Sequence, residues 1–183
     1  MPAFETSALT FGDLCSSGKG AKTVPLVGPN TYSPGELRVL WEPKSFDGTD
    51  QNRVSISFQP TPDVETDVLA LEKWAVACLS VDSRKYLGQD LTEAQVRDRF
   101  VSALKTSEKG FKSLRAKMNF TGRNGIQCWD QNKQKRELPE DWLCSSVTPI
   151  FRVKGLWIMS REMGLLFELE HAQIGEAKAE CPF

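Results

Sequence analysis

The sequence has 183 residues, of which 40% are hydrophobic and 26% charged, and its formal net charge is −1. This composition is that of an ordinary globular protein, not of a disordered or membrane protein. We expect no contact with a membrane interior, because no apolar run approaches the roughly 20 residues that a helix needs to cross a bilayer. No basic start followed by an apolar run comes after Met1, so we expect an intracellular protein.

The small net charge hides an uneven distribution along the chain. Residues 105–161 hold 12 Lys and Arg against 5 Asp and Glu, a net of +7, whereas the rest hold 11 against 19, a net of −8. Such asymmetry indicates an electrostatic partner for the basic part.

The metal-binding residue types are sparse. The five cysteines lie at wide, irregular spacing without a CxxC pair, and His171 is the only histidine. A zinc site built from these residues is excluded, and we expect no metal and no cofactor. The cysteines favour free thiols in a reducing compartment, which is the host cytoplasm or nucleus if the protein is viral.

Catalytic motifs are also missing. Residues 18–23 (GKGAKT) lack the GxxxxGK[ST] spacing of a phosphate loop, and neither a nucleophile elbow nor HExxH occurs. His171 is in step with Leu165, Phe167 and Leu169, which favours a structural histidine. We expect that the protein is not an enzyme.

The first half of the chain predicts an arm, two strands and two helices. Residues 1–36 are rich in Gly, Pro, Ser and Thr and predict a loosely structured arm with one strand at 23–27. Strands are expected at 37–41 and 53–59. Apolar residues at helical spacing predict a helix over 64–86, capped by Asp63, and a second over 92–108, where Thr92 and Gln95 form a capping box.

The second half predicts strands and a tail. Alternating residues indicate strands at 114–120, 126–129, 149–159 and 164–174, with a bend at Gly155, and residues 175–183 predict a flexible tail. The fold class expected is therefore mainly β with an α insertion (α+β). Residues 37–174 would form an OB-fold-like antiparallel small barrel of five or six strands, with a helical insertion at 64–108.

Basic and aromatic residues interleave on these strands. Single-strand binders need cations for phosphates and aromatic faces for bases. The candidate DNA-binding residues are Lys105, Lys109, Lys112, Arg115, Lys117, Arg123, Trp129, Arg152, Lys154 and Trp157. We expect at least one of Trp129, Trp142 and Trp157 to be exposed enough to stack on a base. The alternative is an ordinary solvated β-face with tryptophans in the core.

The order of these motifs resembles that of the single-stranded DNA-binding proteins of short-tailed bacteriophages. The similar segments are residues 4–9 (FETSAL), 54–58 (VSISF) with the Pro-rich stop and helix that follow, 129–133 (WDQNK), 151–155 (FRVKG) and 164–169 (GLLFEL). The resemblance implies binding of single-stranded DNA with little sequence preference, as an accessory protein of replication or recombination.

The C-terminus has a second resemblance. Residues 180–183 (ECPF) are similar to the acidic, Phe-terminated ends of single-stranded DNA-binding proteins of bacteria and phages. It implies that Phe183 binds replication proteins and that the tail competes with DNA. Two alternatives stay open, a viral or cellular structural β-domain that assembles into a homo-oligomer and an RNA-binding barrel.

Overall fold

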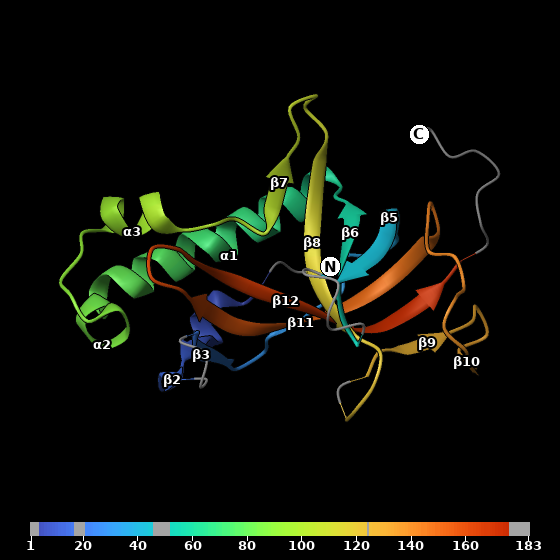
Figure 1. Cartoon of the computed structure of the whole chain (residues 1–183), viewed down its shortest axis with the longest axis horizontal. Helices are drawn as coiled ribbons and strands as arrows, with labels where there is room; N and C mark the ends of the chain where they lie inside the picture. Colours follow the sequence, from blue (N-terminus) through green and yellow to red (C-terminus); the bar gives the residue numbers. More distant parts are fainter. Residues whose placement is uncertain (1–3, 17–20, 46–51, 124, 176–183) are drawn as a thin grey trace.

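The computed structural model describes residues 4–16, 21–45, 52–123 and 125–175. A large, strongly bent sheet makes up most of it, and three helices lie toward one end (Figure 1). The prediction of a mainly β, α+β chain is confirmed. None of the described helices has the length and apolar character needed to cross a membrane.

The N-terminal arm contains more strand than its sequence predicts. After a 3-10 turn, η1 (Thr6–Ala8), come β1 (Thr10–Phe11), β2 (Cys15–Ser16), β3 (Lys22–Val27) and β4 (Thr31–Tyr32). Three of these strands have two residues each, too few to show a period of two. They add to the sheet through β3 and β11 rather than forming a separate unit.

Three helices separate two strands of the sheet: α1 (Pro62–Val81), α2 (Ser83–Leu87) and α3 (Glu93–Arg99). The Thr61 side chain, not Asp63 as predicted, accepts the capping hydrogen bond from the backbone N–H of Val64. The capping box of Thr92 and Gln95 is confirmed. The predicted extension of the last helix to residue 108 is wrong, because the chain becomes extended after α3 and pairs as a strand.

The remaining strands are β5 (Leu37–Ser45), β6 (Arg53–Gln59), β7 (Leu104–Thr106), β8 (Lys112–Asn119), β9 (Gln127–Trp129), β10 (Lys135–Arg136), β11 (Ser146–Ile158) and β12 (Met163–Ile174). Pairing runs from β5 to β6, β8, β12 and β11, and β11 pairs back onto β5. The five strands therefore form a closed cycle of neighbours.

Two pairings are parallel, which corrects the prediction of an antiparallel sheet. β12 lies parallel to β8, with Leu169 opposite Met118, and parallel to β9, with Ala172 opposite Cys128. The chain from β8 to β12 runs through β9, β10 and β11, and a connection of this length is what a parallel pair requires. All other strand pairs are antiparallel.

Alternate residues of these strands form the core. Phe58, Phe151 and Phe167 are fully buried, and their rings meet edge to face at centroid distances of 5.3 and 6.4 Å. The predicted bend at Gly155 is confirmed, because the register of β11 on β12 shifts between Val153 and Gly155. The positive φ of Gly155, 136°, is one that residues with a Cβ rarely adopt.

The cysteines differ in state. Cys15, Cys78 and Cys128 are free thiols, and burial raises the pKa of the Cys128 thiol to about 11. Cys144 is disulfide-bonded, so the prediction of free thiols is wrong at that position.

Candidate nucleic-acid interface

The outer surface of β5, β6 and β8 carries a group of cations. We call this surface the basic face and define it by Trp41, Lys44, Arg53, Ser55, Ser57, Arg115, Lys117 and Asn119. Its side chains lie in cross-strand rows: Trp41 opposite Ser57 opposite Arg115, then Lys44 opposite Ser55 opposite Lys117, then Arg53 opposite Asn119.

The alternation of β6 explains why the cations stand out from the sheet. Val54, Ile56 and Phe58 point into the core, so Ser55 and Ser57 face outward. Because these two side chains are short, the surface over β6 lies below the longer side chains of β5 and β8 on either side. The Ser55 hydroxyl accepts a hydrogen bond from Lys117 Nζ at 2.9 Å and fixes the direction of that ammonium.

Acidic neighbours are scarce on the basic face. Among the residues that the structure describes, Lys44, Arg53 and Arg115 have no carboxylate within 4.0 Å. Cations without such partners keep their positive potential, which is the requirement for attracting phosphates.

Arg152 and Lys154 have a different environment. The row of Lys117 continues to Glu168 of β12 and then to Arg152 of β11. Arg152 Nε lies 2.6 Å from Glu170 Oε1, and Lys154 Nζ lies 3.3 Å from Glu168 and 3.6 Å from Glu170. Two carboxylates thus balance two cations, so this pair adds little to the positive potential of the surface.

The pKa of Glu170 reflects its ion pairs with Arg152 and Lys154. Burial alone raises it, but the hydrogen bond from Arg152 and the charges of Arg152 and Lys154 outweigh burial and hold the pKa below its usual value. The hydrogen bond to Glu170 also raises the pKa of the Arg152 guanidinium. Glu170 therefore stays ionised at neutral pH and remains a partner for Arg152 and Lys154.

The other predicted cations are spread over the surface. Lys105 lies on β7, Lys109 at the turn between β7 and β8, and Lys112, at the start of β8, is ion-paired with Glu65 of α1. Arg123 follows β8 and borders a cavity of about 540 Å³ that Arg53 and Lys154 also line. Phe183, the predicted partner-binding residue, lies outside the described residues.

The three tryptophans predicted to stack on bases are buried or half-buried. Trp142 is only 3% exposed. Trp129 is half-buried, and its Nε1 donates to His171 Nδ1 at 3.3 Å. Trp157 is half-buried against Gly164, where a Cβ atom would lie 3.0 Å from the indole.

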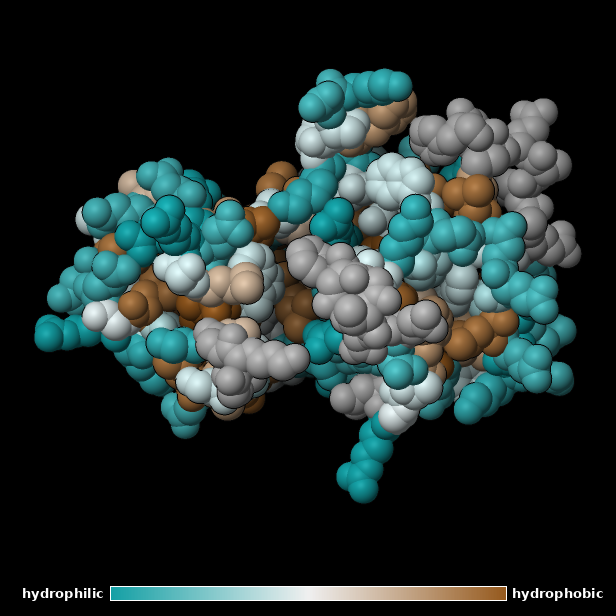
Figure 2. Space-filling model, in the orientation of Figure 1, coloured by the Kyte–Doolittle hydropathy of each residue, from teal (hydrophilic) through white to brown (hydrophobic). Residues whose placement is uncertain are grey.

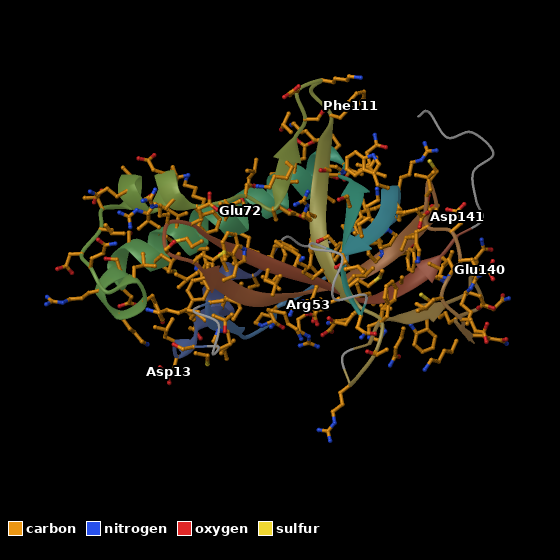
Figure 3. The ribbon with its side chains drawn as sticks, in the orientation of Figure 1. Asp13, Arg53, Glu72, Phe111, Glu140 and Asp141 are labelled. Carbon is orange, nitrogen blue, oxygen red and sulfur yellow. The ribbon has the colours of Figure 1, made fainter. Side chains whose placement is uncertain are left out.

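Two exposed rings lie elsewhere and were missed by sequence reasoning. Trp41 on β5 is 48% exposed, and Phe111, beside the tip of the β7–β8 hairpin, is 53% exposed (Figure 3). In Figure 2 this hairpin projects from the body of the protein at the top of the view. Both rings line a cleft of about 740 Å³ between the hairpin, β5 and the end of β6. We call it the aromatic cleft.

Clusters of metal-ligating side chains are absent from the described part of the chain. No group of three or more His, Cys, Asp or Glu side chains comes together there in a way that could hold an ion.

No family model matches the sequence, and no curated protein matches it. Solved structures do match. The single-stranded DNA-binding protein from bacteriophage Enc34, in complex with single-stranded DNA, aligns with a TM-score of 0.53 at 10% identity, over 93% of this chain and 97% of that one. The gp2.5 single-stranded DNA-binding protein of bacteriophage T7 aligns with a TM-score of 0.56 at 12% identity, over 84% and 90%. The fold is that of these phage proteins.

A C-terminal truncation of the Enc34 protein aligns with a TM-score of 0.52 at 10% identity, over 97% of this chain and 99% of that one. The shared fold therefore extends over almost the whole chain. At such identities the alignment assigns no residue, so the site is argued from this chain's own geometry.

Proposed function

We propose that this protein binds single-stranded DNA across the basic face with little sequence preference, as an accessory protein of replication or recombination. The closed cycle of β5, β6, β8, β12 and β11, with one parallel pair, supports an OB-type barrel, a fold that binds oligonucleotides on the outer face of its strands. The fold shared with two phage single-stranded DNA-binding proteins supports the same ligand.

One observation carries the proposal: three cations of the basic face have no carboxylate within 4.0 Å in the part of the chain that the structure describes. Lys44, Arg53 and Arg115 can each approach a phosphate without first breaking an ion pair. Contacts to phosphates are the same for every base, so binding through them is independent of sequence. The exposed ring of Trp41 lies in the row of Arg115, where it can stack on any base.

A titration of the protein with labelled oligonucleotides tests the proposal. Single-stranded DNA, the same sequence as a duplex, and the matching RNA are compared at several salt concentrations. We expect tighter binding to single-stranded DNA and a log affinity that falls linearly with log salt. Equal or tighter binding to the RNA would instead support the RNA-binding alternative, because only RNA offers a 2′-hydroxyl.

A pair of variants places the site. Arg115→Ala removes one cation of the basic face, and we expect the salt slope to fall by about 0.7, the value per phosphate for single strands. Arg84→Ala is the matched control, because it removes an exposed arginine on α2, at the far end of the molecule in Figure 1. Equal slopes for wild type, variant and control would show that the DNA lies elsewhere. Assembly without any oligonucleotide binding would favour the structural alternative.

A further inference from the structure

The aromatic cleft adjoins the basic face and differs from it in chemistry. It is lined by Trp41 of β5, by Gln59 and Pro60 at the end of β6, and by residues 107–112 of the hairpin. Its volume of about 740 Å³ falls within the range of about 300–1,000 Å³ that is usual for small-ligand sites. An aromatic ring on the strand side and another on the hairpin side make it a site for a flat group.

We propose that the aromatic cleft holds an unstacked nucleobase of the bound strand, with Trp41 and Phe111 as the stacking residues. The inference rests on the proposed function and names a distinct subsite within it. The backbone of the DNA would follow the cations of the basic face, and one base would turn off that face into the cleft.

The charges of the cleft favour a base over a phosphate. The described residues of its lining include two cations, Lys109 and Lys112, and two carboxylates, Glu65 and Glu108. Lys112 is already ion-paired with Glu65. A phosphate would meet a lining without net positive charge, whereas a neutral aromatic ring loses nothing there and gains stacking contacts.

The hairpin holds Phe111 in place before any ligand arrives. The backbone N–H of Phe111 donates to Ser107 Oγ at 3.0 Å, and the N–H of Ser107 donates to the Phe111 carbonyl at 2.8 Å. Gly110, at a φ of 81°, allows the tight turn between them. The ion pair of Lys112 with Glu65 ties the hairpin to α1 close to its turn. A ring on a fixed backbone costs less entropy on binding than one on a loose loop.

The position of Trp41 links the two surfaces. Trp41 is the first member of the row that continues through Ser57 to Arg115 on the basic face, and it is also a wall of the cleft. Figure 3 places Phe111 and Arg53 toward opposite ends of this region. A single strand can therefore run from Arg53 past Arg115 and end with a base at Trp41.

Two variants and a modified ligand test the inference. Phe111→Ala and Trp41→Ala are titrated with a normal oligonucleotide and with one that carries abasic sites. Each variant should weaken binding to the normal strand by about 5- to 150-fold, the loss expected for one stacked base. The salt slope should stay at the wild-type value, because no phosphate contact is lost. On the abasic strand, the variants and the wild type should bind alike.

Matched variants separate stacking from a general loss of structure. Leu69→Ala removes an apolar side chain on α1 that is 54% exposed, close to the exposure of Phe111, and should leave binding unchanged. Phe111→Tyr keeps a ring and should bind as the wild type does. The inference is overturned if Phe111→Ala binds the normal strand as tightly as the wild type, or if its loss is equally large on the abasic strand. Failure of the proposed function looks different, because then the wild type shows no salt-dependent binding at all.

Discussion

Replacing Gly155 by alanine tests the close approach of β3 to β11, its antiparallel neighbour. A Cβ atom at this position would lie 1.9 Å from the carbonyl oxygen of Val24 and 2.8 Å from the backbone nitrogen of Leu26. Both are backbone atoms of β3, so no side-chain rotation relieves the clash, and the two strands must move apart. Overpacking costs about 1–3 kcal/mol and a strained φ about 1–3 kcal/mol more, so the free energy of unfolding should fall by about 2–6 kcal/mol.

Thermal and chemical unfolding followed by circular dichroism measure this loss. A change of 1 kcal/mol shifts Tm by about 2–4 °C in a domain of this size, so we expect Tm to fall by about 4–24 °C. Gly88→Ala is the control, because Gly88 also has a positive φ, 74°, but a Cβ there meets nothing within 4 Å. That variant should lose only the cost of the left-handed conformation, about 1–2 kcal/mol. Equal losses for the two variants would refute the close approach of β3 to β11.

Three further predictions concern charge. The double variant Arg115→Ala with Lys117→Ala should lower the salt slope of DNA binding by about 1.4, twice the value per phosphate, while the control variant on α2 keeps the full slope. Burial raises the pKa of Glu72, so ionising this carboxyl lowers the free energy of unfolding of the wild type. As pH rises through the raised pKa, Glu72→Gln should therefore become more stable relative to the wild type. Unfolding at several pH values measures the difference. Glu72→Ala should instead lose about 1–3 kcal/mol, because the buried N–H of Ala103 loses its acceptor. The pKa of Glu170 is held low, so wild type should exceed Glu170→Gln in stability at neutral pH, and the difference should vanish as pH falls through the folded-state pKa. If the stability difference between the wild type and Glu72→Gln, or between the wild type and Glu170→Gln, does not change with pH, the shift of the corresponding pKa is contradicted.

Much of the fold is local enough to be predicted from the sequence. The alternation of Val54, Ile56 and Phe58 gave β6, and the pair Thr92 and Gln95 gave the start of α3. Both signals depend on residues a few positions apart. The parallel pairing of β8 with β12 could not be predicted in this way, because it joins Lys117 to Glu168 and no short pattern records which strands meet.

The exposed position of Trp41 was missed for a specific reason. Leu37, Val39 and Trp41 alternate, and a regular strand would send all three side chains to one face. The register on β6 shifts between Val39 and Trp41, so one extra residue lies between them and the indole turns outward. Such a bulge reverses the face of the residues after it until the next register shift, here between Trp41 and Lys44, and the sequence has no marker for it.

Arg152 and Lys154 were predicted to bind DNA although both have carboxylate partners, and the reason is related. Arg152 and Lys154 look like an exposed basic row when β11 is considered alone. Their carboxylate partners, Glu168 and Glu170, are on β12, and the two strands place these residues side by side. Net charge along a segment therefore overstates the potential of a surface whenever the neighbouring strand carries the opposite sign.

The cycle of strands also sets the order in which the chain can fold. β5 pairs with β11 through Leu37 and Val147, and β8 pairs with β12, the last strand of the described chain. During synthesis, β5, β6, β7 and β8 can pair with one another, but the part of β8 at Lys117 and Met118 lacks its second neighbour until β12 leaves the ribosome. Contacts so distant in sequence slow folding, and the open edge of β8 is a place where another chain can pair meanwhile. The basic face gains its full support only after β12 has been made.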